Sequence, residues 1–451
     1  MRDRVSVVGG GLAGCEAALQ LAARGYPVRL VEMRPVGSTP AHQTDHLGEL
    51  VCTNSFKSED PANAHGQLKH EMDALGSVLL RSARAARVAA GSALAVDRRL
   101  FSAAMTAALE THPDIEITRE ECVRLPEGPA VVATGPLTSD ALSAEIGRVL
   151  GSGGLSFFDA IAPIVDRESL DEAVVFAQGR FGEDDDYLNC PFTREEYEAF
   201  VQALREGEVH EGHDWDAVPY FEGCLPIEVM AARGVDTLRF GPMKPIGLTD
   251  PRTGERPWAV LQLRREDRSG RMWNLVGCQT RLRIAAQRRV FRSVPGLAGA
   301  EFLRWGSIHR NSYLNFPGRL AAHGGLPQRP ELIFAGQLTG VEGYTESAAS
   351  GILAGINLAR ILEGAEPVLP PPTTMLGGLL RYLREAEPKH FQPMNSNWGL
   401  VDPLRRRIRD RKARREALAR RARNDFLAWM RATGIRPVPA DPVARPSGLR
   451  S

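Results

Sequence analysis

Short apolar runs alternate with longer helical segments at the start of the chain. Residues 5–8 are apolar enough to predict a buried strand, which passes directly into a glycine-rich turn. An Ala- and Leu-rich segment ending near Arg24 predicts a helix, with Gly25 placed to stop it. Residues 27–32 predict the next strand. This order of strand, helix and strand is typical of a parallel β-α-β unit.

The same apolar pattern returns far along the chain. Residues 130–135 and 332–336 each predict a strand that ends on glycine, and a long helix is expected over 346–362. Between these regions, residues 185–290 are richer in Trp, Arg, Pro and turn residues, with little β-α alternation. We therefore expect a discontinuous nucleotide-binding domain interrupted by a smaller α+β inserted domain. The predicted limits are 1–184 and 291–436 for the first domain, 185–290 for the insertion, and 437–451 for a disordered tail.

The spacing Gly9-x-Gly11-x-x-Gly14 lies between the first strand and the first helix, the context in which it predicts dinucleotide binding. Gly9 permits the tight turn, Gly11 lets the backbone approach a pyrophosphate, and Gly14 lets helix and strand pack closely. Glu32 ends the next strand, where a carboxylate can accept the hydroxyls of an adenosine ribose. A glycine turn without a ligand is the alternative.

The chain re-enters the nucleotide-binding domain only after the inserted domain. This order favours FAD over NAD, because flavoproteins of the glutathione-reductase type need the chain to re-enter that domain after an insertion. The predicted fold is thus α/β, with a discontinuous Rossmann-like FAD-binding domain of that type. Its helix near Glu346 would point its N-terminus at the flavin N1/C2 carbonyl. Gln337 stands where many such proteins have Asp. The predicted cofactor contacts are Gly9, Gly10, Gly11, Leu12, Ala13, Gly14, Glu32, Thr134, Gly135, Gly336, Gln337, Gly351 and Ile352.

Composition excludes several other classes of protein. With 451 residues, 43% hydrophobic and 25% charged, the chain is that of a soluble protein with more than one core. It has no apolar run near the roughly 18 residues of a membrane helix and no room for a signal peptide, so we expect a cytoplasmic protein. Its six cysteines form no C-x-x-C pair, which argues against disulfides or zinc. His210 and His213 lack a distant third ligand, so no metal is expected.

Cys15 and Cys224 have different predicted roles. Cys15 lies among Ala and Leu on the first helix, which indicates a buried, inert thiol. Cys224 precedes Pro226 and a predicted helix over 227–233 that Gly234 would end. A helix N-terminus favours thiolate, so Cys224 is a candidate reactive residue. A structural cysteine at a tight turn is the alternative.

The net charge of +1 conceals a basic C-terminal region. Residues 405–423 hold eleven Lys or Arg against Asp410 and Glu416. We expect a helix here, with one side docked through apolar residues and a band of guanidinium groups facing outward. Such a band suits a phosphate-rich partner, and a charged helix that only aids solubility is the alternative. The docking residues would be Leu404, Ile408, Leu418, Ala422 and Phe426.

Eight segments along about residues 5–430 together carry a family resemblance. The chain closely resembles the bacterial folate- and FAD-dependent tRNA (uracil-5-)-methyltransferases called TrmFO. Cys278 departs from the family, where a bulky aromatic is expected. The segments are GGGLAGCEAA from Gly9, GELVCTNSFKS from Gly48, LAVDRRLFS from Leu94, ATGPLTSDAL from Ala133, FEGCLPIEVMA from Phe221, DTLRFGPMKPIGL from Asp236, HRNSYLNFP from His309 and AGQLTGVEGYTESAASG from Ala335.

The resemblance implies methylation at C5 of a T-loop uridine in tRNA. It implies methylenetetrahydrofolate as carbon donor and NADH or NADPH as reductant, acting through FAD. Uracil C5 becomes nucleophilic once a thiolate adds to C6, and Cys224 matches the family's cysteine after Glu-Gly. Cys52 would lie near the flavin and assist or guard it. Folate candidates are Arg283, His309, Glu342 and Tyr344, and tRNA candidates are Arg406, Arg409, Arg414 and Arg421.

Three alternatives belong to other functional classes. The tRNA wobble-uridine carboxymethylaminomethyl modifying flavoproteins are related but longer, with an extra helical domain. A plain NAD(P)H-dependent flavin reductase would need no basic tail. A non-catalytic, FAD-stabilised RNA-binding protein would not depend on Cys224.

Overall fold

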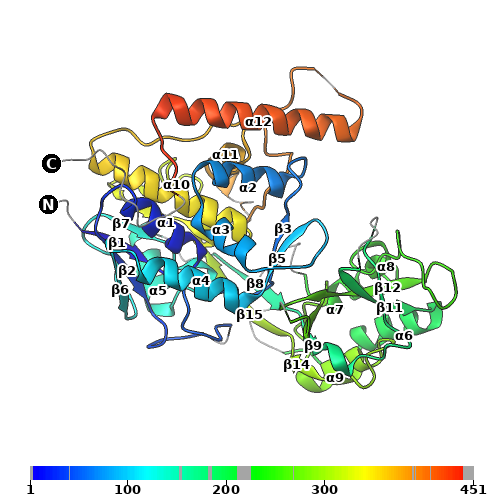
Figure 1. The fold of residues 1–451 in the computed structure, drawn as a ribbon. Coiled ribbons are helices and arrows are strands. Elements are labelled where there is room, and N and C mark those ends of the chain that lie inside the picture. Colours follow the sequence, from blue (N-terminus) through cyan, green and yellow to red (C-terminus); the bar gives the residue numbers. More distant parts are fainter. Residues whose placement is uncertain are drawn as a thin grey trace.

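A computed structural model describes residues 4–39, 41–151, 155–180, 185–210, 225–267, 269–388, 391, 393–406 and 408–439. Figure 1 shows a larger lobe, which holds both ends of the chain, and a smaller lobe built from its middle. In the described part of the chain, no helix has the length and apolar character needed to cross a membrane.

A six-stranded sheet lies at the centre of the larger lobe. Strand β17 pairs with β7 in parallel although about 200 residues separate them, as Ile333 opposite Val131 shows. The predicted strands at both ends of the chain are confirmed, and they belong to one sheet. Only the edge pair β16–β17 is antiparallel. In spatial order the strands are β16 (Gly325–Leu326), β17 (Arg329–Phe334), β7 (Ala130–Val132), β1 (Val5–Val8), β2 (Val28–Glu32) and β6 (Ile115–Arg119).

Helices α1 (Leu12–Ala22) and α10 (Tyr344–Leu362) cross at very short range next to this sheet. A Cβ added at Gly351 would lie 2.1 Å from the carbonyl oxygen of Ala13, and one at Gly355 would lie 2.7 Å from that of Ala17. Only glycine at these two positions lets the backbones approach so closely. The other helices of the lobe are α2 (Ala64–Ala74), α3 (Val78–Ala85), α4 (Arg98–Glu110), α5 (Asp140–Leu150), α11 (Met375–Glu385) and α12 (Arg411–Thr433).

The smaller lobe has its own antiparallel sheet and its own core, which includes Tyr197, Phe200 and Phe291. The sheet takes strands from residues 164–304, so it extends beyond both ends of the predicted insertion at 185–290. Its strands in spatial order are β10 (Phe176–Ala177), β11 (Tyr187–Phe192), β12 (Ala259–Arg265), β13 (Met272–Leu275), β9 (Ile164–Asp166) and β14 (Phe302–Arg304). Helices α6 (Arg194–Arg205), α7 (Ile227–Ala232), α8 (Thr237–Phe240) and α9 (Ile284–Arg292) complete the lobe.

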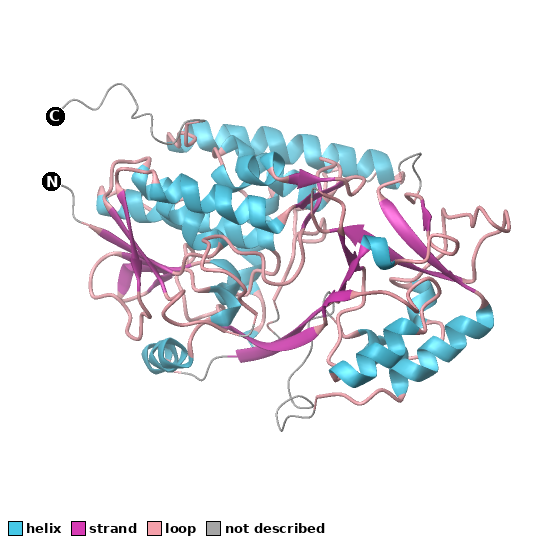
Figure 2. Cartoon of the chain, turned by 60° about the horizontal axis from the view of Figure 1, so that its bottom comes forward, coloured by secondary structure: helices cyan, strands magenta, loops and turns pink. Residues whose placement is uncertain are grey.

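Two small sheets lie between these parts. The antiparallel pair β8 (Leu155–Ile161) and β15 (Ser307–Tyr313) carries the chain from one lobe to the other and back (Figure 2). A three-stranded sheet of β3 (Ser55–Ser58), β5 (Ala93–Val96) and β4 (Arg87–Val88) lies on the larger lobe where it faces the smaller one (Figure 1).

The C-terminal region differs from its prediction in two respects. Helix α12 begins at Arg411 because the Asp410 side chain accepts the N–H of Ala413 at 2.7 Å, so Leu404 and Ile408 precede the helix and the expectation that they dock it was wrong. Leu418, Ala422 and Phe426 are buried as predicted. Residues 437–439, expected to be disordered, instead pack on the lobe, with Val438 donating its N–H to the Leu75 carbonyl at 3.1 Å.

Candidate active site

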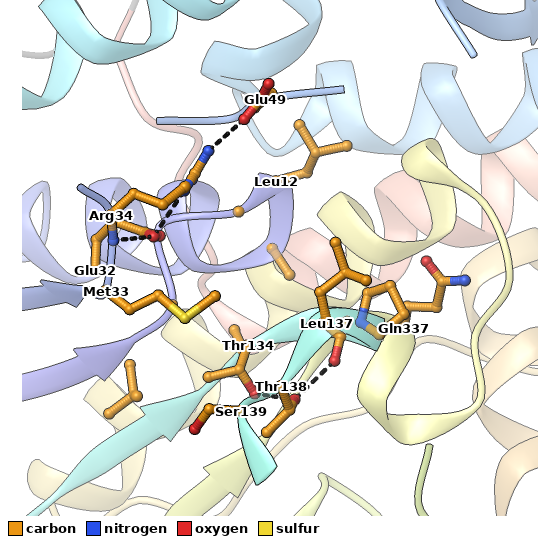
Figure 3. A pocket seen from close by; sticks show the side chains of 18 of the residues that line it. Leu12, Glu32, Met33, Arg34, Glu49, Thr134, Leu137, Thr138, Ser139 and Gln337 are labelled. Carbon is orange, nitrogen blue, oxygen red and sulfur yellow. Dashed lines mark hydrogen bonds and ion pairs between the residues drawn. The ribbon is translucent and has the colours of Figure 1, made fainter. Parts of the chain in front are cut away.

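A cleft opens at the carboxyl ends of β1, β2 and β7 in the larger lobe. Its volume is about 940 Å³, including the part open to solvent, which suits a large organic cofactor. Side chains from the glycine turn, the end of β2, the turn after β7 and the turn at Gln337 converge on it (Figure 3). The start of α10 lines it as well. The predicted residues that line it are Gly9, Gly11, Leu12, Ala13, Glu32, Thr134, Gly135, Gly336, Gln337 and Tyr344.

The three motif glycines have different surroundings. Gly9 has φ +102°, and a Cβ there would lie 2.6 Å from the Ala133 carbonyl oxygen. A Cβ at Gly14 would lie 1.8 Å from the carbonyl oxygen of Gly9, so this glycine lets helix and strand pack. A Cβ at Gly11 would meet no atom within 4 Å. Because Gly11 also lines the cleft, its open side is where a ligand can approach the backbone.

Glu32 is held at the edge of the cleft by a dense set of donors. Its Oε2 accepts the N–H of Gly10 at 2.8 Å, and its Oε1 accepts the N–H and Nε of Arg34 at 3.0 and 2.8 Å. Burial would raise the pKa of this carboxyl, but the Arg34 and Gly10 bonds outweigh burial and hold the pKa below its usual range. An ionised carboxylate accepts about four hydrogen bonds, so Oε2 keeps capacity for a ligand hydroxyl.

The glycine-rich segment that follows β17 contributes residues to the cleft and also to the contact between α10 and α1. Gly336 and Gln337 line the cleft, and Gln337 donates to the Glu342 carboxylate at 2.8 Å. Gly351 and Ile352, which were expected to lie along the cofactor, do not line the cleft. Both are buried, and Gly351 faces Ala13 of α1, so the position of Gly351 supports a packing role.

The first turn of α10 faces the cleft through Tyr344 and Ser347. The helix begins at Tyr344, two residues before the predicted start near Glu346. Glu346 itself is buried and contacts His65 Nδ1 at 3.1 Å. Burial raises the pKa of this carboxyl, but the His65 hydrogen bond and nearby positive charge outweigh it and lower the pKa to about 2. Glu346 is therefore charged at neutral pH.

Cys52 lies in a loop beside the cleft, and Tyr344 holds that loop. The Tyr344 hydroxyl accepts the N–H groups of Cys52 and Thr53 at 2.8 and 3.0 Å. Burial raises the pKa of Tyr344, so its hydroxyl stays protonated and able to donate. The cleft itself is lined by the neighbouring Val51 rather than by Cys52, whose side chain is half-buried.

Cys224 lies outside the described residues, as does the side chain of His309. The segment after Cys224 is described: Pro226 is the N-cap of α7, and Glu228 accepts from Thr280 Oγ1 at 2.8 Å. Arg283 lies in the smaller lobe, exposed, at the N-cap of α9.

Of the remaining cysteines of the described chain, Cys122 is half-buried and the other three are buried, and burial raises the pKa of the Cys122 thiol. Cys15 is buried as predicted, with Sγ 3.3 Å from the Gly10 carbonyl, and burial raises the pKa of this thiol. Cys190 and Cys278 are buried in the smaller lobe, where burial raises the pKa of both. No group of three or more potential metal ligands occurs among the described residues.

The candidate tRNA-binding arginines are not equivalent. Arg406, Arg409 and Arg414 are exposed at the start of α12 or just before it. Arg421 is half-buried and donates to the backbone carbonyls of Pro403 and Asp402, so it does not face outward as predicted. It ties α12 to the segment that precedes it.

Sequence reasoning missed a group of polar residues at the junction of the lobes. Arg98 opens α4 and reaches Glu266, which follows β12, at 2.9 Å. Arg98 belongs to the segment LAVDRRLFS, whose recurrence in the family was the only signal in the sequence. Its partner is 168 positions away, beyond any local pattern.

Comparison with known proteins places these features in a family. The model of glucose inhibited division protein A matches residues 4–366. The methylenetetrahydrofolate--tRNA-(uracil-5-)-methyltransferase TrmFO of Geobacter sulfurreducens is 53% identical over 433 residues, covering 95% of this chain and 99% of the relative. The TrmFO of Thermus thermophilus is 51% identical over 444 residues, covering 98% and 99%. The structure of Aquifex aeolicus GidA superposes with a TM-score of 0.67 at 18% identity, covering 94% of this chain and 73% of that one, which confirms the fold.

Proposed function

This chain belongs to the family of glucose inhibited division protein A and, within it, to the TrmFO methyltransferases, and from that premise we propose that it methylates C5 of a T-loop uridine in tRNA. The carbon comes from methylenetetrahydrofolate, and the reducing equivalents come from NADH or NADPH through FAD, in the cytoplasm. The observation that carries this proposal is the identity of about one residue in two with TrmFO relatives over nearly the whole length of both chains.

The cleft offers partners for three parts of FAD. The open side of Gly11 and the N-terminus of α1 suit the pyrophosphate, and Glu32 suits the ribose hydroxyls. The N-terminus of α10, behind Tyr344, suits negative charge on the flavin ring. FAD bound here would supply the transfer of electrons from the nicotinamide to the carbon unit.

The protein's own residues activate the uridine. The Cys224 thiolate adds to C6 of the uracil, which makes C5 nucleophilic, and the same thiolate leaves once C5 has gained its carbon and lost its proton. Cys52 assists or guards the flavin side of this chemistry. Arg283, His309, Glu342 and Tyr344 remain the candidates for folate, and Tyr344 additionally fixes the backbone of Cys52.

One assay tests the proposal directly. The purified protein is incubated with NADH, methylenetetrahydrofolate labelled at the methylene carbon, and an unmodified tRNA transcript. Labelled ribothymidine in the digested tRNA is the expected product. A different labelled uridine derivative would indicate a related modification, and NADH oxidation without labelled tRNA would indicate a flavin reductase. Either outcome contradicts the proposal.

The basic region before and within α12 is expected to bind tRNA phosphates. Reversing Arg406, Arg409 and Arg414 to Glu removes three exposed charges without touching a described ion pair. We expect weaker tRNA affinity. The slope of log affinity against log salt concentration should decrease in magnitude by up to about three, since each lost phosphate contact lowers that slope by roughly one. Filter binding at several salt concentrations measures both.

Reversal of Arg99, Arg124 and Arg436, three exposed arginines of the larger lobe that lie outside residues 405–423 and take part in no described ion pair, is the matched control for net charge. It should leave the salt slope at the parental value. If the two triple variants behave alike, α12 is only a solvated surface. The tRNA contacts would then be sought on the smaller lobe, around residues 264–292.

A further inference from the structure

The loop over residues 50–54, which carries Cys52, lies where the two lobes meet and is bonded from three directions. The first direction is helix α4. Asp97 caps this helix by accepting the N–H groups of Arg99 and Leu100 at 3.0 and 3.1 Å, which fixes Arg98 at its first turn. From there, Arg98 donates to the carbonyls of Leu50 at 2.9 Å and Cys52 at 3.1 Å.

The same guanidinium reaches across to the smaller lobe. Arg98 Nε lies 2.9 Å from Glu266 Oε2, and the two side chains are only 18% and 1% exposed. A buried carboxylate needs a paired charge, so Glu266 depends on Arg98. One arginine therefore uses its fixed fork of donors to bind the Cys52 loop and the other lobe at once.

The second direction is strand β12 of the smaller lobe. Arg264 donates to Thr53 Oγ1 at 2.7 Å and to Asn54 Oδ1 at 3.1 Å. Asn54 in turn donates to the Arg265 carbonyl at 2.9 Å. The third direction is the cleft, where the Tyr344 hydroxyl accepts the N–H groups of Cys52 and Thr53. The backbone around Cys52 thus has partners in the cleft, in α4 and in the smaller lobe.

We propose that Arg98 is a positioning residue that holds the Cys52 loop and the smaller lobe in one arrangement beside the cleft. The inference rests on the proposed function, because it states that methyl transfer requires the arrangement held by Arg98. The described residues that line the cofactor cleft all belong to the larger lobe, so we assign flavin reduction to that lobe. Methyl transfer also needs the smaller lobe, whose chain contains Cys224. Loss of that arrangement should therefore affect the second reaction and spare the first.

The test compares Arg98→Met with Arg99→Met, a substitution of the adjacent, exposed arginine. For Arg98→Met we expect the parental FAD content and the parental bleaching of the flavin by NADH in the absence of oxygen. The rate of tRNA methylation should be about 100-fold lower, which is the size of effect that misplaced reacting groups produce. Arg98→Lys keeps a positive charge for Glu266 but lacks the several donors of a guanidinium. Its rate of tRNA methylation should lie between those of the parent and of Arg98→Met. Arg99→Met should match the parent in both reactions.

Arg98→Met leaves Glu266 buried without its partner, so a second variant, Arg98→Met with Glu266→Met, removes that charge as well. It should fold as stably as the parent and still methylate slowly. A thiol-labelling measurement supplies an independent readout. In a background of Cys122→Ala and Cys224→Ala, Cys52 is the one remaining cysteine of the described chain that is not buried, and its labelling by a maleimide should accelerate when Arg98 is replaced.

Two outcomes overturn the proposal. The first is parental methylation by Arg98→Met and by Arg98→Met with Glu266→Met, together with parental labelling of Cys52. The second is a parallel loss of flavin reduction and methylation, which would indicate general damage to the larger lobe. Failure of the parent protein to methylate tRNA would instead refute the proposed function, and the labelling result would still show whether Arg98 holds the loop.

Discussion

Replacement of Gly11 by leucine is expected to give a folded but colourless protein. A Cβ at this position meets no atom within 4 Å, so the new side chain starts into open space. It extends instead into the cleft, at the place where the pyrophosphate of FAD must approach the backbone. We expect FAD to be lost during purification, and with it both NADH oxidation and methyl transfer. Absorbance near 450 nm and FAD released on denaturation measure the loss.

Two further glycine variants separate cofactor loss from misfolding. Gly128→Leu places the same side chain at an exposed turn with open space around it, and this protein should stay yellow. Gly14→Ala adds a Cβ only 1.8 Å from the carbonyl oxygen of Gly9, so it should lower the thermal midpoint as well as the FAD content. A Gly11→Leu protein that retains a full complement of FAD would refute the placement of the cofactor.

Replacement of Cys224 by alanine is expected to abolish methyl transfer while leaving the flavin in place. Without a thiolate to add to C6, uracil C5 has no nucleophilic character. Loss of a covalent nucleophile lowers turnover by a factor on the order of 10³ or more. FAD content and flavin bleaching by NADH should stay parental, because the described residues that line the cofactor cleft all belong to the larger lobe. Ribothymidine formed per minute, measured beside flavin reduction, gives the two rates.

Cys278→Ala is the matched control, since it removes a buried thiol from the smaller lobe. It should methylate tRNA at the parental rate, with at most a modest loss of stability. If Cys224→Ala also methylates at that rate, the nucleophile is elsewhere, and Cys52 is the next cysteine to replace. The double replacement would then decide whether either thiol is needed.

The elements of the larger lobe were predictable because their signals are local. A short apolar run that ends on glycine and precedes a helical segment is compatible with few structures other than a buried strand. Three such strands were predicted within a few residues of their observed bounds. Gly351 shows the limit of this reasoning. A glycine that faces a cofactor and a glycine at a helix crossing look alike in sequence, and the contact with Ala13 decides between them.

Features that depend on distant partners were missed. The strand at 164–166 joins the second sheet by pairing with β13, and the strand at 302–304 joins by pairing with the strand at 164–166, so local composition did not reveal them. The limits of the inserted domain stay a prediction, and this pairing favours 164–304 over 185–290. Val438 is ordered by residues more than 350 positions earlier, and Arg98 binds the smaller lobe through Glu266. Cys224 as nucleophile stays a prediction from the family resemblance.

The parallel pairing of β7 with β17 has a consequence for synthesis on the ribosome. The first 150 residues leave the exit tunnel with one edge of their central sheet unpaired and α1 uncovered, because β17 and α10 are encoded some 200 residues later. At the translation rates typical of cells, this delay lasts roughly 10–40 s. The smaller lobe can fold in that interval, whereas the larger one cannot. Nascent chains halted before residue 330 should therefore engage chaperones and capture no FAD, and chains halted beyond residue 400 should capture it.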